Sequence, residues 1–302
     1  LKTARGQING IINMVEEDQY CIDISNQLLS SISLLKSTNK IIIAVVVIIA
    51  VIAVGLYASG SLGTSDNGSG DNEVNLAAAA SLKNVYDEKL IPMFEEQNPG
   101  MTVTPTYASS GDLVKQIENG LGADVFMSAG NKQMDELINE SYVDNSSNVK
   151  FLENKLVLIV PADSDANITS FEELKDVEGT IAIGDPESVP AGQYANESLH
   201  NLGIWDDVEP KLSLATDVTA VLNQVAQGSA EYGLVYSTDA KSTDDVKVVC
   251  EAPEDSLKTI VYPVAPLADS QNDDATAKFM EFLQSQEAKD IFVEYGFTIH
   301  DE

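Results

Sequence analysis

An uncharged run of small and branched residues, VNLAAAA at positions 74–80, leads straight into an amphipathic segment. Such a run predicts a buried strand of the kind that packs between two layers of helices. Ser81, which follows it, is of a residue type preferred at helix N-caps. Apolar residues then recur at helical spacing: Leu82, Val85, Tyr86, Leu90 and Phe94. A helix that starts where a strand ends presents unpaired N–H groups and its positive dipole end there. The junction therefore predicts an anion-binding position that needs no charged side chain.

A second junction of this kind follows, with its serine, Ser110, 29 residues after Ser81. Residues 101–107 predict a strand, residues 108–111 (ASSG) a turn, and residues 112–117 the opening of another helix. Two interpretations stay open from the residues alone. The serines cap their helices and do nothing more, or the two helix starts point at one ligand, as they do in neighbouring strand–helix units of a doubly wound sheet.

The strand–helix alternation continues to the end of the chain. Further strands are expected at 123–128, 155–160, 180–184, 211–214, 232–236 and 259–265, and helices at 132–138, 192–202, 218–226 and 274–295. Asp217 is the expected N-cap of the 218–226 helix. We predict an α/β fold of two lobes with a ligand cleft between them, lobe one being 73–157 and 261–302 and lobe two 158–260.

The charge of the chain excludes two classes of partner. The formal net charge is −31, and residues 73–302 hold 13 Lys, no Arg and 42 Asp or Glu. Nucleic acid and anionic membrane surfaces are repelled by such a surface. An anionic ligand is repelled as well, so an anion site here depends on local N–H and O–H donors.

Residues 41–57 carry no charge and follow Lys36 and Lys40. Their length lies between that of a spanning helix and that of a secretory signal, so 41–58 is expected to be either an uncleaved membrane anchor or a cleaved signal segment. The lysines place its start on the cytoplasmic side, and the globular part outside. Residues 59–72, rich in Gly and Ser, predict a flexible linker.

Two cysteines, Cys21 and Cys250, lie on either side of this segment and cannot pair if it spans a membrane. Cys250 is expected to be a packed free thiol. No cluster of Cys and His indicates a metal site, and no cofactor is expected.

Several collinear motifs in residues 73–300 resemble the molybdate-binding protein of ABC importers. They are AAAASL at 77–82, YASS at 107–110, GLGADVFMSA at 120–129, GDPESVPAG at 184–192, GLVYSTDA at 233–240, YPVA at 262–265 and YGFTI at 295–299. The resemblance implies a two-lobe fold like that of type II periplasmic binding proteins. It also implies capture of molybdate or tungstate outside the cytoplasm, and delivery to an ABC permease and its ATPase by a monomer.

The resemblance also implies the ligand contacts. Ser81 and Ser110 would donate from hydroxyl and backbone N–H, Ala191 and Val218 from backbone N–H, and Tyr236 from its phenol. Neutral donors in a dry cleft suit a tetrahedral dianion, because they gain strength from the low dielectric and avoid the desolvation of a buried ion pair. Without the resemblance, Tyr236 reads as a core or rim tyrosine.

The first part of the chain resembles a different family. RGQI at 5–8 and EEDQYCID at 16–23 are similar to the start of the copper-sensing or formaldehyde-sensing helical repressors. In that family a cysteine at the position of Cys21 acts with later ligands, which this chain lacks because it becomes membrane-like first. Residues 1–40 are therefore interpreted as a truncated repressor-like segment.

Two alternatives to molybdate or tungstate binding remain. The site could serve another tetrahedral oxyanion such as sulfate or phosphate. More remotely, carboxylates near the cleft could indicate a hydrolytic enzyme. These are Asp124, Asp185, Asp217 and Asp239. The enzyme is disfavoured because these residues can accept local N–H bonds, and because a G-x-S-x-G elbow, a P-loop and a histidine suited to a triad are all missing.

Overall fold

The computed structural model of the chain describes residues 72–270 and 272–300. All of these residues belong to one compact unit. The expected repressor-like segment 1–40, the apolar segment 41–58 and all of the linker 59–72 except Asn72 lie outside the described residues. Among the residues that are described, no helix has both the length and the apolar character needed to cross a membrane.

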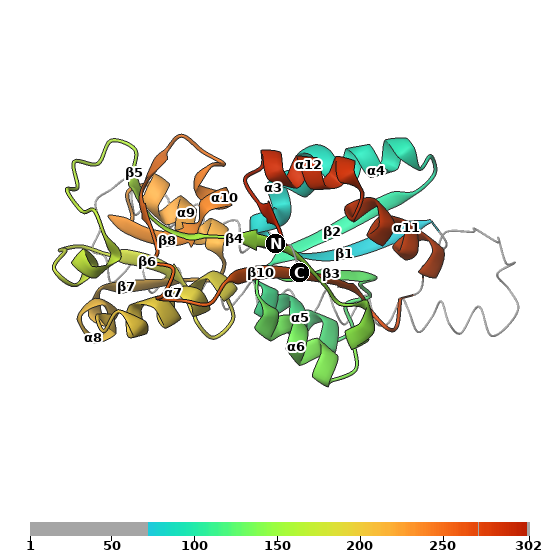
Figure 1. Cartoon of the computed structure of the whole chain (residues 1–302), viewed down its shortest axis with the longest axis horizontal. Coiled ribbons are helices and arrows are strands. Elements are labelled where there is room, and N and C mark those ends of the chain that lie inside the picture. Colours follow the sequence, from blue (N-terminus) through green and yellow to red (C-terminus); the bar gives the residue numbers. More distant parts are fainter. Residues whose placement is uncertain (1–71, 271, 301–302) are drawn as a thin grey trace, which may run out of the picture. The chain divides into compact units, whose positions relative to one another are not determined.

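Two mixed β-sheets, one in each lobe, organise this unit (Figure 1). The six-stranded sheet of lobe one has the order β11-β4-β10-β3-β1-β2. Its strands are β1 (Glu73–Ala79), β2 (Thr102–Ala108), β3 (Val125–Met127), β4 (Val149–Asn154), β10 (Ile260–Pro266) and β11 (Thr298–Ile299). Strand β1 runs parallel to β2 and β3, whereas β10 is antiparallel to β3 and β4.

The five-stranded sheet of lobe two has the order β7-β6-β8-β5-β9. Its strands are β5 (Leu156–Pro161), β6 (Ile181–Gly184), β7 (Leu212–Ala215), β8 (Tyr232–Tyr236) and β9 (Val246–Glu251). Strand β6 is parallel to β7 and β8, and β5 is antiparallel to β8 and β9. In β9, Cys250 is a partly buried free thiol, and burial raises its pKa to about 11.

Helices cover both faces of each sheet. Those of lobe one are η1 (Ala80–Leu82), α3 (Lys83–Val85), the π-helical turn η2 (Tyr86–Leu90), α4 (Ile91–Gln97), α5 (Ser110–Glu118), α6 (Asn131–Asn139), η3 (Asn145–Ser147), α11 (Asp273–Leu283) and α12 (Gln286–Glu294). Those of lobe two are η4 (Phe171–Lys175), α7 (Pro190–Asn201), α8 (Trp205–Val208), η5 (Glu209–Lys211), α9 (Val218–Ala226) and α10 (Ser237–Ala240).

The central strand β1 is buried on both faces, which is the reason for its uncharged run. Leu76 and Ala78 belong to the hydrophobic core under α3, α4, α11 and α12. Ala77 points the other way, into a second core with Leu113 of α5 and Met134 of α6. Figure 1 shows these two helix layers on opposite sides of the sheet. Small side chains at this strand therefore let two layers approach it.

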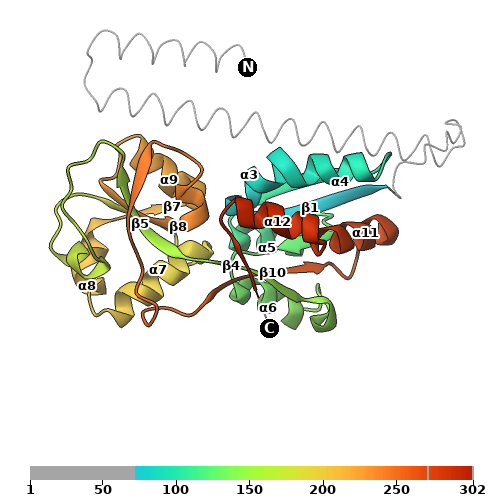
Figure 2. The ribbon, with the colours of Figure 1, turned by 45° about the horizontal axis from the view of Figure 1, so that its top comes forward.

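The chain passes between the lobes twice (Figure 2). The first passage is at Lys155, between β4 and β5, so Leu156 and Val157 already lie in the second sheet. The expected lobe boundary after residue 157 is thus two residues late. The return passage is made by residues 252–259, between β9 and β10. These two passages place the ends of β4 and β10 beside the junction of the lobes.

Candidate ligand-binding site

The predicted ligand residues lie at the starts of helices in both lobes. Ser110 is the first residue of α5, Ala191 the second of α7 and Val218 the first of α9. Tyr236 ends β8 and immediately precedes α10. All four are buried, with at most 4% of their surface exposed, whereas Ser81 is half-buried.

Ser81 does not cap its helix. The helical turn starts one residue earlier, at Ala80, and Ala79 occupies the N-cap position without a side-chain bond. The Ser81 hydroxyl instead contacts the Tyr262 hydroxyl at 3.0 Å, across 181 residues of chain. The expectation that Ser81 is an N-cap is therefore wrong. At the second junction the cap is Ser109, whose Oγ accepts from Asp112 N–H, and Asp217 caps α9 as predicted.

First-turn amides from both lobes are left without a partner. Helix geometry gives these N–H groups no acceptor within the helix. Across residues 72–270 and 272–300, the amides of Ser81, Ser110, Ala191 and Val218 donate no hydrogen bond. Four N–H groups, three of them on residues that are at most 4% exposed, are thus available to a bound anion.

The backbone of Ala129 connects two candidate residues from different lobes. Its N–H donates to Ser110 Oγ at 3.0 Å, and its carbonyl oxygen accepts from the Tyr236 hydroxyl at 3.0 Å. The Ser110 hydroxyl therefore accepts a hydrogen bond within the protein, and its own proton remains available to a ligand. The Tyr236 hydroxyl instead donates its one proton to Ala129 O, so no proton is left for a ligand. For Tyr236 to donate to a ligand, its bond to Ala129 has to be exchanged.

Further contacts hold the two lobes together at this position. Gly111 N–H donates to Ser188 O at 2.9 Å, and the Gln133 amide nitrogen lies 3.2 Å from Gln193 Oε1. A Cβ on Gly111 would lie 2.5 Å from Ser188 O, so glycine is needed for this approach. The structure is consequently closed at the helix starts.

A cavity of about 460 Å³ adjoins the candidate residues. Ser81, Thr219 and Asp239 line it, and the two lysines on its wall are Lys83 and Lys241. Lys83 is paired with Asp87 at 2.7 Å. None of the five predicted ligand residues is cationic, so the site consists of hydrogen-bond donors.

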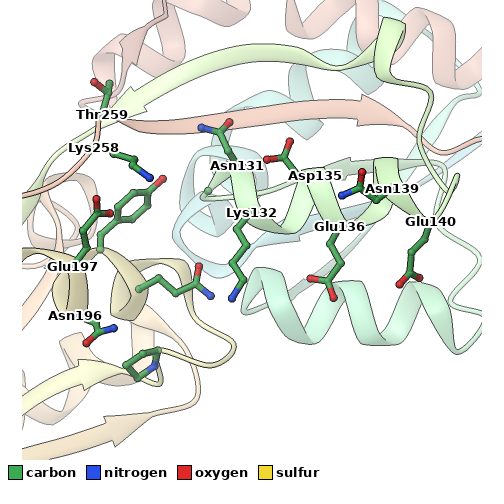
Figure 3. A pocket seen from close by; sticks show the side chains of 14 residues that line it. Asn131, Lys132, Asp135, Glu136, Asn139, Glu140, Asn196, Glu197, Lys258 and Thr259 are labelled. Carbon is green, nitrogen blue, oxygen red and sulfur yellow. The ribbon is translucent and has the colours of Figure 1, made fainter.

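A second cavity, of about 870 Å³, lies between α6 and α7 and contains none of the five predicted residues (Figure 3). Lys132 and Lys258 line it together with Asp135, Glu136, Glu140 and Glu197. Four carboxylates against two lysines make this cavity unfavourable for a dianion. We therefore place the candidate site at the helix starts.

Within the described part of the chain, Asp239 is the one carboxyl that is buried beside the candidate donors. Its Oδ2 accepts from Tyr236 N–H at 3.2 Å. Burial raises the pKa of Asp239 to about 7, the charge of Asp217 adds to this, and the bond from Tyr236 N–H opposes it. The other three carboxylates considered from the sequence also accept backbone N–H bonds. These are Asp124 from Asn75, Asp185 from Glu187 and Asp217 from Ala220.

Sequence reasoning missed three residues that shape the site: Ala129, Asn154 and Tyr262. Ala129 acts through its backbone N–H and carbonyl, which no side-chain pattern reveals. Asn154 and Tyr262 lie on β4 and β10, far along the chain from Ser81. The motif YPVA at 262–265 was the one signal available for Tyr262.

Two α/β lobes joined by two passages, with helix starts of both lobes at their junction, define a ligand-binding protein of the periplasmic-binding-protein type. The chain belongs to the family described as bacterial extracellular solute-binding protein, whose profile matches residues 74–298. A second profile, that of metal-sensitive transcriptional repressors, matches residues 1–48. The repressor-like resemblance of the first part of the chain is thereby confirmed, and the relatives named as molybdate-binding confirm the other resemblance.

Within this family, the chain is similar to molybdate-binding proteins and to substrate-binding proteins of ABC transporters. The chain is 39% identical to the molybdate-binding protein ModA of Escherichia coli over 238 residues, covering 76% of this chain and 90% of that protein. It is 38% identical to the putative ABC transporter substrate-binding lipoprotein YvgL of Bacillus subtilis over 239 residues, covering 78% and 91%. A solved substrate-binding domain of a putative molybdenum ABC transporter from Clostridium difficile is 39% identical, with a TM-score of 0.60, covering 76% and 99%.

Proposed function

We propose that residues 73–302 bind molybdate or tungstate and deliver it to an ABC importer. One observation carries the proposal. Amides without an acceptor lie at helix starts of both lobes, two serine hydroxyls lie beside them in lobe one, and none of the predicted contacts is a cation. The relatives named as molybdate-binding, at 39% identity, support the same ligand.

The chemistry of the donors fits a tetrahedral dianion. Four oxygens carrying two charges need several donors, and a hydrogen bond to a charged group is about twice as strong as a neutral one. Within the closed lobes the low dielectric strengthens each bond further. The acidic surface does not prevent capture, because oriented donors act at contact distance whereas surface charge is screened by salt.

The cellular arrangement follows from the same proposal. The binding unit acts outside the cytoplasm, secreted or tethered through residues 41–58, as a monomer that delivers ligand to separate permease and ATPase chains. It is a carrier and not an enzyme, and the four carboxylates considered from the sequence each accept a backbone N–H bond, which is a structural role. Sulfate or phosphate is the alternative ligand, because both are tetrahedral.

Calorimetric titration of the 302-residue chain with molybdate, tungstate, sulfate and phosphate tests the proposal. We expect one site per chain for molybdate and tungstate. Sulfate should bind more weakly, because the smaller ion cannot reach all donors at once. Tighter binding of sulfate or phosphate would replace the proposed ligand, and absence of binding by all four ions would refute an oxyanion carrier.

A further inference from the structure

A chain of hydrogen bonds leads from the first passage between the lobes to the candidate site. Asn154, at the end of β4, donates from Nδ2 to the Tyr262 hydroxyl at 3.2 Å and to Thr238 Oγ1 at 2.9 Å. The Tyr262 hydroxyl in turn lies 3.0 Å from Ser81 Oγ. Distance alone does not tell which of these two hydroxyls donates.

The surroundings of Asn154 determine which group donates in each of these hydrogen bonds. Its Oδ1 lies 2.9 Å from the backbone N–H of Lys155, a group that can only donate. Ser237 Oγ donates to the same oxygen at 2.9 Å. The atom facing Tyr262 must therefore be the Asn154 amide nitrogen, which has no lone pair to offer.

Tyr262 has one proton, and the hydroxyls of Ser81 and Tyr236 are both close to it. The Tyr236 hydroxyl sends its own proton to Ala129 O, and the hydroxyl that contacts Tyr262 with hydrogen-bond geometry is that of Ser81, at 3.0 Å. Its oxygen accepts from Asn154, so its own O–H is directed at Ser81 Oγ. The side chain is fully buried, which leaves no solvent acceptor. Burial also raises the pKa of Tyr262 well above its usual range, so the phenol keeps its proton.

We propose, on the basis of the proposed function, that Tyr262 is a positioning residue for the ligand. Its hydroxyl donates to Ser81 Oγ and thereby leaves the Ser81 proton for an oxyanion in the cleft. Ser81 lines the 460 Å³ cavity, and its proton has no acceptor among the described residues. Ser81 then matches Ser110, whose oxygen is likewise engaged by a donor, the N–H of Ala129. The arrangement makes both serines donors in the free protein, so no rotamer entropy is spent on binding.

A double-mutant cycle between Ser81→Ala and Tyr262→Phe tests the proposal in the 302-residue chain, with molybdate and tungstate as probes. We expect Tyr262→Phe to weaken binding about 3- to 10-fold, the loss of one neutral hydrogen bond. Ser81→Ala should weaken it about 10- to 150-fold, because the bond to a charged ligand is lost. In the Ser81→Ala background, Tyr262→Phe should change the Kd less than about 2-fold, since Tyr262 acts through Ser81.

Tyr86→Phe is the matched control. Tyr86 is also fully buried in an aromatic cluster, but its hydroxyl donates to Met127 Sδ. It should lower the melting temperature as Tyr262→Phe does and leave the Kd unchanged. Equal costs of Tyr262→Phe with and without Ser81 would overturn the positioning role. A wild-type chain that binds none of the oxyanions would instead refute the proposed function itself.

Asn154→Asp provides a second test. It reverses the direction of the hydrogen bonds from residue 154 through Tyr262 to Ser81 without removing the hydroxyl of Tyr262 or of Ser81. A carboxylate at this position can only accept, so it takes the Tyr262 proton and leaves Ser81 to donate to the phenol oxygen. We expect a loss of affinity at least several-fold larger with Tyr262 present than in the Tyr262→Phe background, where only the added charge and the lost bond to Thr238 Oγ1 act. The same loss in both backgrounds would contradict the proposal, even if Ser81→Ala proves too weak a binder to measure.

Discussion

Ser110→Ala removes a donor whose surroundings are fully described. Ser110 is completely buried, and its Oγ accepts from Ala129 N–H at 3.0 Å. In the proposed complex its proton binds a charged oxygen, and such a bond contributes about 1.5–3 kcal/mol. The substitution should therefore weaken molybdate binding about 10- to 150-fold.

Stability should fall as well, for a separate reason. Alanine leaves the buried Ala129 N–H without its acceptor, which costs about 1–3 kcal/mol of unfolding free energy in the free protein and in the complex alike. This cost cancels from the binding equilibrium because it is present in both states. Calorimetry thus reports the lost ligand bond, and thermal unfolding reports the orphaned amide.

Ser109→Ala is the control for this comparison. Ser109 precedes Ser110 and caps the same helix through Asp112 N–H at 3.2 Å. Its loss should cost about 0.5–2 kcal/mol of stability and leave affinity nearly unchanged. A Ser110→Ala chain that binds like wild type, or a Ser109→Ala chain that loses as much affinity, would refute the assignment of Ser110 as a ligand donor.

Three further predictions concern charge and closure. Asp239→Asn should stabilise the fold by about 2–4 kcal/mol at pH 8 and by little at pH 4. The wild-type fold loses stability as pH rises from about 4 to 7, because burial raises the pKa of the Asp239 carboxyl to about 7. Unfolding measured as a function of pH should show this difference, and the affinity of wild type, but not of the variant, should fall above pH 7. Gly111→Ala should keep or slightly raise the melting temperature, because alanine favours the helix more than glycine does. It should weaken binding at least 10-fold, because its Cβ would lie 2.5 Å from Ser188 O and keep the lobes apart. Tight binding by this variant would contradict the closed site. Raising NaCl from about 0.05 to 0.5 M should change the molybdate Kd less than about 3-fold, because no exposed ion pair is screened, and a steep loss would indicate an unrecognised cation.

The strands and helices were predictable because their signals are local. The run at β1, the helical spacing after it and the Asp217 cap each depend on a few neighbouring residues, and β8 and α9 match their predicted bounds. The helix after β1 differs from a regular one by its early start at Ala80 and by the π-helical turn η2, although the predicted apolar positions are buried.

The hydrogen bonds of the site could not be predicted, because they join residues that are distant in sequence. Ser81 meets Tyr262 only because β1 and β10 lie on either side of β3 in one sheet. Ala191 and Val218 contribute amides, so their side chains carry no signal, and only the motif resemblance identified them. The sequence also assigned the Tyr236 proton to a ligand, whereas the structure directs it to Ala129 O across the lobes.

The central claim is that neutral donors of both lobes hold the anion at the helix starts. Tungsten anomalous scattering from crystals of the chain grown with tungstate locates the ion directly. We predict one strong peak within hydrogen-bond distance of the Ser81 and Ser110 hydroxyls and of the Ala191 and Val218 amides. A peak between Lys132 and Lys258 in the cavity of α6 and α7, with none at the helix starts, would contradict the claim.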